Sequence, residues 1–402
     1  MKSDMSTTKK SNHLVLHIAP TPFFADRGCH IRIEGIVRSL RVLDWDSVVC
    51  TYHHGYDVEG VETRRIGAIE SYTQTAAGPN PWKLWADLKL LWLSANTYRR
   101  ERPDVIHAHL HEGLFIGLLV KWVFFWRRTP LIADLQGSFT GELDSHGVFK
   151  KLGFLKPIFR FAEKVLMWFP NHIVCSSERS LNLFINDFHI NPERISLAQD
   201  GADKGAELSN KQRSALFKEL GLPKDKTLVV YSGALLDSKG LKQLQKLIQR
   251  SDPLRTHFLI IGYPTEALAE FLATSQLNDR CSLLGQFPFE RLPQLLQLSD
   301  IAVDPKNFDA GEGSGKMLNY MANGLPVLAF DTPNNRAFLP SNTPLAANVE
   351  DMANQLDSWL SDANERSATA QHNQVFFDEN YSWTVTQGQL SDVYLGISSA
   401  DL

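Results

Sequence analysis

The sequence predicts an α/β protein with two doubly wound, Rossmann-like domains in tandem. Short apolar runs of strand length recur along the chain, separated by segments with helical periodicity. These runs are hydrophobic nearly throughout rather than alternating, which is typical of parallel strands covered on both faces. A polar stretch, Asp203 to Lys226, divides the runs into two series, and 402 residues are too many for one ordinary core.

The strands of the two series are predicted from these apolar runs. The first series is His13–Ala19, Ser47–His53, Asp104–Leu110, Pro130–Gln136, His172–Ser177 and Arg194–Gln199. The second series is Thr227–Gly233, His257–Gly262, Cys281–Gln286, Ile301–Asp304 and Leu325–Phe330. Residues 1–204 and 205–373 are therefore the predicted domains, and an amphipathic C-terminal helix, 374–402, is expected to pack against the body of the protein.

Composition and charge exclude several classes of protein. The hydrophobic content of 43% and charged content of 21% are those of a soluble globular enzyme, and a net charge of −4 argues against a nucleic-acid partner. The scattered four cysteines predict a reducing compartment, and the polar N-terminus predicts no export signal. The longest apolar run, Leu114 to Trp126, is shorter than the ~20 residues of a membrane span. A cytoplasmic protein is expected.

The stretch from Glu312 to Phe330 predicts a helix that starts at an anion-binding loop. Ser314 is a candidate N-cap, Gly315 lets a ligand approach the backbone, and Lys316 adds positive charge to a turn with unpaired N–H groups. Gly324 is placed where a left-handed residue ends a helix. Glycine-rich loops are common in α/β proteins, but this pattern favours a phosphate site.

Ligands of doubly wound domains bind beyond the carboxyl ends of the strands, so the residues that follow each strand are candidates for function. Gly233 ends the first strand of the second domain, and Lys239 follows as a cation that can meet a diphosphate without a metal, or as a solvated surface lysine. In the first domain, Gly28 stands at the entrance of a helix, where it could admit a phosphate or an acceptor oxygen, and Asp26 and Arg27 precede it. No dinucleotide or P-loop fingerprint is present.

Three histidines, His107, His109 and His111, alternate at the end of the third strand. In an extended strand they would share one face, which raises the possibility of a metal site. No carboxylate or cysteine stands at ligand spacing, so we favour a non-metal role in which His109 hydrogen-bonds a sugar hydroxyl or polarises a reacting group. A purely structural role stays open for His107 and His111.

These motifs together resemble the retaining glycosyltransferases of family 4, which have the GT-B fold. The resemblance covers nearly the whole chain. The matching segments are Arg102–His109, Asp200–Asp203, Gly233–Gly240, Glu312–Asp331 and Tyr381–Trp383. It implies two Rossmann-like domains that face a central cleft, with a C-terminal helix that crosses back to the N-terminal domain.

The resemblance also implies a division of roles. The N-terminal domain would bind the acceptor, and the C-terminal domain would bind a nucleotide-diphosphate sugar as the donor substrate, with no required cofactor or metal. His109 would lie beside the transferred sugar, Glu312 near the donor sugar, and Lys239 at the diphosphate. Gly28 would lie near the reaction centre, and Gly315 to Met317 would offer N–H groups to the diphosphate.

The predicted site has three parts. The catalytic residues are His109, Glu312 and Lys239. The donor and diphosphate site is Gly233, Lys239, Ser314, Gly315, Lys316, Met317 and Asn319. The acceptor side is Asp26, Arg27, Gly28 and Gln136, and no residue is assigned to a metal.

Two positions depart from the family pattern. The family commonly has a glutamate at the place of Asn319 and another at the place of Gly311, with Glu312 one residue away. An arginine is usual where this chain has Ala234. Asn319 keeps hydrogen-bonding capacity for a ribose hydroxyl but has no charge, and Lys316 would replace the charge of the missing arginine without its bidentate geometry.

The resulting prediction is transfer of a sugar, with retention, to a glycan or lipid-linked acceptor in polysaccharide or glycoconjugate biosynthesis. Aromatic and basic clusters around Trp82–Arg100, Lys121–Arg128 and Phe159–Trp168 favour a peripheral contact with the inner face of a membrane, although aromatic core residues beside a solvated face would give the same pattern. A GT-B phosphorylase or epimerase, or a non-catalytic sugar-binding subunit, remains the alternative.

Overall fold

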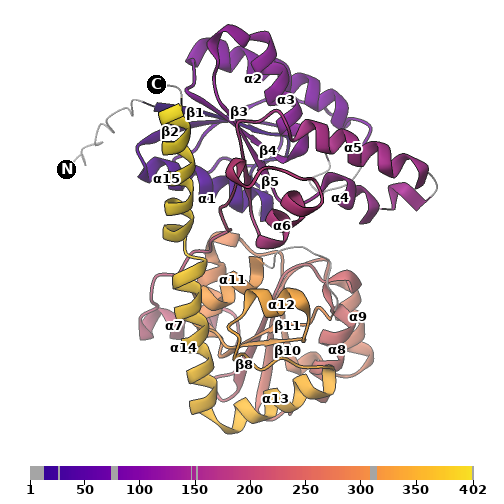
Figure 1. Ribbon diagram of the computed structural model, residues 1–402. Helices are drawn as coiled ribbons and strands as arrows, with labels where there is room; N and C mark the ends of the chain where they lie inside the picture. The colour runs from indigo at the N-terminus through magenta and orange to yellow at the C-terminus, as the bar shows by residue number, and fades with distance from the viewer. Residues whose placement is uncertain are drawn as a thin grey trace. The chain divides into compact units, whose positions relative to one another are not determined.

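The computed structural model describes residues 13–25, 28–73, 80–145, 147–150, 153–307 and 315–400. By their internal contacts, the residues form two compact units: unit 1 is Met1–Asp200 with Trp383–Leu402, and unit 2 is Gly201–Ser382. Each unit contains one parallel β-sheet (Figure 1).

The sheet of unit 1 has the strand order β3-β2-β1-β4-β5-β6-β7, and every neighbouring pair is parallel. Its strands are β1 (His13–Ala19), β2 (Trp45–Thr51), β3 (Glu62–Arg65), β4 (Val105–His109), β5 (Leu131–Leu135), β6 (His172–Cys175) and β7 (Ile195–Leu197). Its α-helices are α1 (Gly28–Val42), α2 (Lys83–Glu101), α3 (Leu110–Val123), α4 (Phe139–Ser145), α5 (Lys156–Leu166), α6 (Glu178–Asn186) and α15 (Trp383–Ala400), and a 3₁₀ turn, η1, spans Phe125–Arg127.

Helices cover both faces of this sheet, because the strands are apolar on both sides. Leu16 and Ile106 pack with residues of α2 and α3 in one cluster. Val15 and Val105 belong to another cluster, which includes Leu40 of α1 together with Leu390 and Tyr394 of α15. The doubly wound arrangement predicted for the first domain is confirmed.

The sheet of unit 2 has the order β10-β9-β8-β11-β12 and is also parallel throughout. Its strands are β8 (Thr227–Ser232), β9 (Thr256–Ile261), β10 (Cys281–Gly285), β11 (Ile301–Asp304) and β12 (Val327–Ala329). Its α-helices are α7 (Asn210–Glu219), α8 (Leu241–Arg250), α9 (Glu266–Thr274), α10 (Leu292–Leu298), α11 (Gly315–Ala322), α12 (Pro333–Phe338), α13 (Val349–Ser361) and α14 (Ala363–Asn380). Two apolar clusters again cover the two faces.

The C-terminal segment consists of two helices where the sequence predicted one. Tyr381 leaves the helical conformation after α14, packs in a core cluster of unit 2 and donates its hydroxyl to Ala337 O at 3.2 Å. Trp383 then begins α15, and the indole ring of Trp383 lies against Gly35 of α1. The chain therefore changes units between these two aromatic anchors, at residue 383 and not at the predicted residue 374. The first boundary between the two units lies between residues 200 and 201, near the predicted boundary between residues 204 and 205.

Candidate active site

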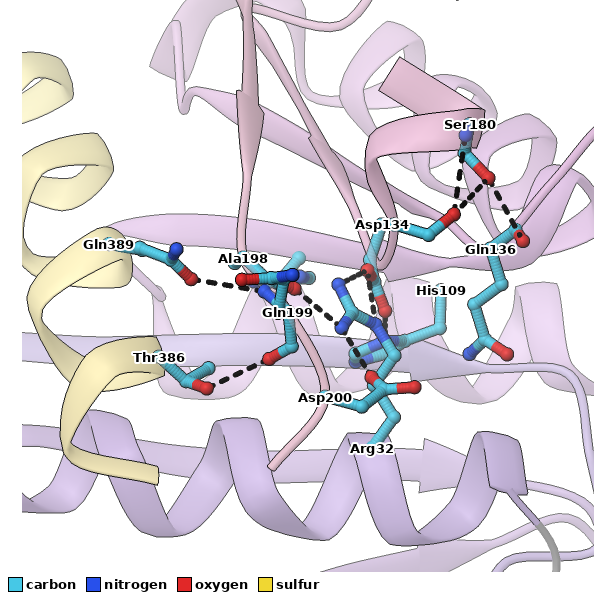
Figure 2. A network of polar contacts seen from close by, with 12 residues as sticks. Arg32, His109, Asp134, Gln136, Ser180, Ala198, Gln199, Asp200, Thr386 and Gln389 are labelled. Carbon is cyan, nitrogen blue, oxygen red and sulfur yellow. Dashed lines mark hydrogen bonds and ion pairs between the residues drawn. The ribbon is translucent and has the colours of Figure 1, made fainter. Parts of the chain in front are cut away.

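The carboxyl ends of the parallel strands meet at one edge of each sheet, and in unit 1 this edge carries a network of buried polar side chains (Figure 2). His109, the last residue of β4, has no exposed surface. Its Nδ1 lies 2.8 Å from Asp134 Oδ2 and its Nε2 lies 3.0 Å from His17 Nδ1. His17 in turn reaches Ser47 Oγ at 3.2 Å. Both ring nitrogens of His109 are therefore engaged within the protein.

Arg32 of α1 balances the charge of this network. Its guanidinium donates to Asp134 Oδ1 at 2.6 and 2.9 Å, to Asp200 Oδ1 at 2.6 Å and to Ala198 O at 2.7 Å. Burial opposes the charged form of Asp134, but Arg32 and His109 outweigh it and hold the pKa of that carboxyl well below its usual range. Figure 2 shows Arg32 between the two carboxylates.

The protonation states follow from this arrangement. An ionised carboxylate only accepts hydrogen bonds, so His109 Nδ1–H donates to Asp134. Burial and the neighbouring His107 and His109 lower the pKa of His17 well below its ordinary value, so His17 is neutral. A continuous series of polar contacts therefore runs from Ser47 through His17 and His109 to Asp134.

The prediction that three alternating histidines share one strand face is wrong. Leu110 has a positive φ of 62° and ends the strand, so His111 lies in the first turn of α3, with its Nε2 3.2 Å from Glu163 Oε1. His17 takes the third place instead, stacked on His107 and His109 with ring centroids 5.2 and 5.3 Å away. His107 is tied to Tyr394 by a 2.8 Å hydrogen bond.

The distances alone would allow a metal site here. Ligand atoms of His107, His109 and Asp134 lie within 4.8 Å of one another. However, Asp134 already accepts hydrogen bonds from Arg32 and His109, and the adjacent guanidinium would repel a cation. The set therefore fits a structural ion-pair network better than a metal centre.

Of the residues predicted for the acceptor side, two lie in described segments. Gln136 directly follows β5, and its buried Nε2 has no hydrogen-bond partner among the residues described. Gly28 is the first residue of α1, and a Cβ there would meet nothing within 4 Å. Asp26 and Arg27 lie outside the described residues. The edge thus offers one unused amide donor and an open helix start.

In unit 2 the carboxyl edge is built from glycines. Gly233 follows β8 with a positive φ of 137°, and Gly262 follows β9. A Cβ at Gly262 would lie only 1.8 Å from Gly233 O, so the two loops approach each other too closely for any side chain at this position. Gly233 itself is exposed. At the carboxyl edge of its sheet, unit 2 therefore has glycine backbone where unit 1 has polar side chains.

Helix α11 begins at the same edge. Gly315 is its first residue, and a Cβ there would meet nothing within 4 Å. The first N–H groups of a helix have no partner within it, which makes such a turn suited to an anion. Met317 is fully buried and anchors the turn in the core. The glycine at the end of the helix, Gly324, has the predicted left-handed conformation, with φ 68°.

Lys316 extends from this turn to the end of β11. Its Nζ lies 2.6 Å from Oδ1 of Asp304, which is almost fully buried, and 5.0 Å from the centre of the Tyr231 ring. Because an ammonium group has three N–H donors, Lys316 can keep Asp304 and still contact a phosphate. Asp304 therefore positions the charge that the sequence predicted for the donor site.

The remaining donor-site residues lie nearby in the chain or outside the described segments. Asn319 is buried, and its Nδ2 donates to Gly315 O at 2.8 Å, so its Oδ1 is the atom left to accept a hydrogen bond. Lys239 ends a 3₁₀ turn, Asp237–Lys239, and is half-buried. Glu312 and Ser314 lie outside the described residues.

Sequence reasoning did not assign His17, Arg32, Asp134 or Asp304 to the site. Two of them could have been recognised in the sequence, because His17 and Asp134 are polar residues within apolar strand segments. A polar side chain buried in such a strand needs a partner, and the partners lie at the same sheet edge. Arg32 gave no such signal, because a basic residue on a helix is usually solvated.

Two family models match the chain, one to each unit. The "Glycosyl transferase 4-like domain" matches residues 27–200, and "Glycosyl transferases group 1" matches residues 212–375. The chain belongs to the family 4 glycosyltransferases. The resemblance seen in the motifs is thereby confirmed, and the protein is a glycosyltransferase.

Relatives and solved structures agree with this assignment. The chain is 23% identical over 319 residues to a D-inositol 3-phosphate glycosyltransferase of Corynebacterium efficiens. The matched region covers 74% of this chain and 72% of that protein. It is 22% identical to the 2-deoxystreptamine N-acetyl-D-glucosaminyltransferase of Streptomyces fradiae, over 81% of this chain and 79% of that one.

Two solved structures share the fold over almost their whole length. Anabaena HepE in complex with UDP and glucose superimposes with a TM-score of 0.72 at 16% identity, over 96% of this chain and 100% of that one. Sucrose-phosphate synthase from Thermosynechococcus elongatus gives a TM-score of 0.76 at 14% identity with the same coverage. The glycosyltransferase therefore has the GT-B fold.

Proposed function

We propose that this glycosyltransferase moves a sugar, with retention and without a metal, from a nucleoside-diphosphate sugar to a glycan or lipid-linked acceptor. The observation that carries the proposal is the first turn of α11, where an unobstructed Gly315 lies next to Lys316. A diphosphate leaving group develops negative charge, which helix N–H groups and a fixed ammonium stabilise. The UDP in the HepE complex makes uridine the first donor base to test.

The charge of Lys316 can be tested by calorimetric titration with UDP. Lys316→Met and Lys239→Met should each weaken UDP binding by about tenfold or more, because a charge-assisted hydrogen bond contributes about 1.5–3 kcal/mol. Lys242→Met is the matched control, since Lys242 lies in the same unit and pairs with Asp237 on the surface. Equal affinity in all four proteins would contradict the proposed donor site.

Retention can be tested before the acceptor is known. Slow hydrolysis of a nucleotide sugar by water breaks the bond between C1 and the diphosphate oxygen and forms a bond from C1 to the water oxygen. With UDP-α-glucose, a retaining enzyme releases α-glucose first, which proton NMR distinguishes before mutarotation. Initial release of β-glucose would contradict retention.

A membrane-bound acceptor is supported by the surface of unit 1. Most of the exposed large apolar side chains in the described residues lie between Trp82 and Phe169. Trp92, Trp122 and Trp126 are each more than 60% exposed, on α2, α3 and η1. Aromatic side chains with basic neighbours are typical of surfaces that lie in a membrane interface. Within the described residues, no helix has the length and apolar character to cross a bilayer.

Vesicle flotation tests this contact. The full chain should float with vesicles containing phosphatidylglycerol, and the triple change of Trp92, Trp122 and Trp126 to serine should leave it in the unbound fraction. Leu254→Ser removes an equally exposed apolar side chain from unit 2 and should float as the unchanged protein does. If the unchanged protein stays out of the lipid fraction, the membrane contact is excluded.

A further inference from the structure

We propose that a groove on unit 1, between α2, α3 and α5, holds the hydrocarbon chain of a lipid-linked acceptor, an inference that rests on the proposed function. The groove encloses about 610 Å³, and its walls are almost entirely apolar. Leu88 and Leu91 of α2, Phe115 and Leu119 of α3, and Phe159 and Phe161 of α5 are among its lining residues. Pockets of ~300–1,000 Å³ suit ligands of small-molecule size.

The first argument is the way α5 is attached. The one buried residue described in this helix is a charged one, Glu163, whereas Ile158 and Phe161 are exposed. Glu163 accepts hydrogen bonds from Phe139 N at 2.8 Å and from Thr140 N and Oγ1 at 3.0 and 2.6 Å. Burial opposes its ionisation, but the bonds from His111 and Thr140 prevail and lower its pKa to about 2. A carboxylate thus fixes α5 while its aromatic side chains stay available.

The second argument is the order of polar and apolar groups along the groove. Its polar lining residues include Asp87, the fifth residue of α2, and Glu112, in the first turn of α3. Lys83, the first residue of α2, joins the starts of the two helices through a 2.5 Å ion pair with Glu112. Later turns contribute Leu91 and Leu119, and at 1.5 Å per residue the seven steps from Glu112 to Leu119 span about 10 Å.

The polar end lies where an acceptor is expected. Helix α3 begins directly after His109, at the carboxyl edge of the sheet, so its first turn lies at that edge and Leu119 lies further from it. An amphiphile with its hydroxyl-bearing head at Glu112 and its chain beside Leu119 would match this order. The chain would then run toward the part of α3 that carries the exposed Trp122.

A hydrocarbon chain fits the groove better than a peptide helix. A helix is ~10–12 Å across, so roughly one turn would fill the volume, too little for several anchoring residues. The surroundings suit an anionic lipid, since Arg99, Arg100 and Arg128 are exposed near the ends of α2 and α3 although the chain as a whole is acidic. The groove and the aromatic surface are therefore two parts of one lipid-binding face.

Direct binding of a hydrocarbon probe tests the inference without an acceptor. The fluorescent fatty acid cis-parinaric acid should bind the full chain saturably below its critical micelle concentration. Leu88→Glu and Phe115→Glu, at two half-exposed positions in the groove wall, should each weaken binding by about tenfold or more because they place a charge against the chain. Thermal unfolding of both variants checks that the fold is retained.

Two controls locate the site. Trp126→Glu changes an exposed side chain of unit 1 that does not line the groove, so it should weaken vesicle flotation and retain parinaric acid binding. Leu254→Glu, in unit 2, should alter neither property. Loss of probe binding in Trp126→Glu, or retention in folded Leu88→Glu and Phe115→Glu, would overturn the groove as the site.

The outcome also separates this inference from the proposed function. If UDP-sugar turnover is seen but parinaric acid does not bind, the groove is excluded and the donor site stands. If the probe binds in the groove but no nucleotide sugar is turned over, the hydrocarbon site stands and the proposed transfer fails.

Discussion

Both units contain a parallel sheet, but different kinds of groups occupy the carboxyl edges of the two sheets. In unit 1, the edge is filled by buried side chains that neutralise one another, with Arg32 between Asp134 and Asp200. In unit 2, it is formed by Gly233, Gly262 and the open start of α11, where backbone is left accessible. The first arrangement is held by paired charges, whereas the second leaves backbone accessible at the place where we propose that the diphosphate binds.

The outer surfaces differ as well. Unit 1 exposes many aromatic side chains on α2, α3, η1 and α5, whereas the exposed large apolar residues described in unit 2 are few and scattered. The apolar face of unit 1 and the glycine-lined edge of unit 2 suit the two chemically different substrates that we propose. The two units therefore share a parallel-sheet architecture and differ in their loops and outer helices.

The largest expected effect is loss of the charge at the centre of the unit 1 edge. Arg32→Met would leave the buried carboxylate of Asp134 and the half-buried carboxylate of Asp200 without their cation, which costs about 3–5 kcal/mol of unfolding free energy. Urea denaturation of the full chain measures it. Arg336→Met is the matched control, because Arg336 pairs with Asp331 on the surface of unit 2, where solvent screens the pair and its loss should change stability little. Equal costs would contradict a charge-fixed edge.

The next effect concerns the glycine edge of unit 2. Gly262→Ala would bring a methyl group to 1.8 Å from Gly233 O, so the backbone must move. We expect about 1–3 kcal/mol lower stability, as for an overpacked site, together with weaker binding of UDP. Urea denaturation and calorimetric titration measure the two effects. An unchanged stability would show that the two loops separate easily and that their close approach is not needed.

A smaller effect should appear as a pH dependence confined to unit 1. Burial, with the neighbouring His109, lowers the pKa of His107 to about 3, and the pKa of His17 is also lowered, so both are neutral in the fold and protonate in the unfolded chain. Their stabilisation is complete above pH ~6.5 and is lost as the pH falls below it, at up to about 1.4 kcal/mol per pH unit for each histidine.

Comparison with a variant isolates this effect. His107→Phe should reduce the slope of unfolding free energy against pH between 6.5 and 5. Asp87, whose pKa burial raises to about 6, opposes the slope, but it does so equally in both proteins. Identical slopes in urea titrations would show that His107 does not stay neutral in the fold.

The smallest effect on stability is expected at Gly315. Since a Cβ there meets no neighbour, Gly315→Ala should leave stability unchanged or raise it by at most about 1 kcal/mol. The same methyl group would lie where the diphosphate is expected, so the affinity for UDP should fall. Melting temperature and calorimetric titration separate the two effects. Unchanged affinity would place the diphosphate away from this turn.

The sequence predicted the strands that have apolar surroundings on both faces. The parallel strands were found because both of their faces are apolar, and β3 was missed because Glu62–Arg65 is a charged strand at the edge of the sheet. The site was predicted unevenly. The α11 turn is local in sequence and was recognised, whereas Arg32, Asp134 and Asp200 come together only through the tertiary fold.

The break between α14 and α15 was beyond sequence pattern for a similar reason. Tyr381 and Trp383 are both aromatic and stand in one amphipathic stretch, so periodicity extends across them. Only the packing shows that the first belongs to the core of unit 2 and the second lies against Gly35 of unit 1. Hydrophobic periodicity shows that one side of a helix is apolar, but it does not show which of the two cores buries that side.

The bond between His107 and Tyr394 has a consequence for synthesis of the chain on the ribosome. Unit 1 buries Leu390 and Tyr394 of α15 against its sheet, so the N-terminal unit is finished only with the last helix. The 182 residues from Gly201 to Ser382 are translated in between, which takes roughly 10–40 s at the usual rates. During that interval, the sheet face around Val105 is covered by α1 but not yet by α15.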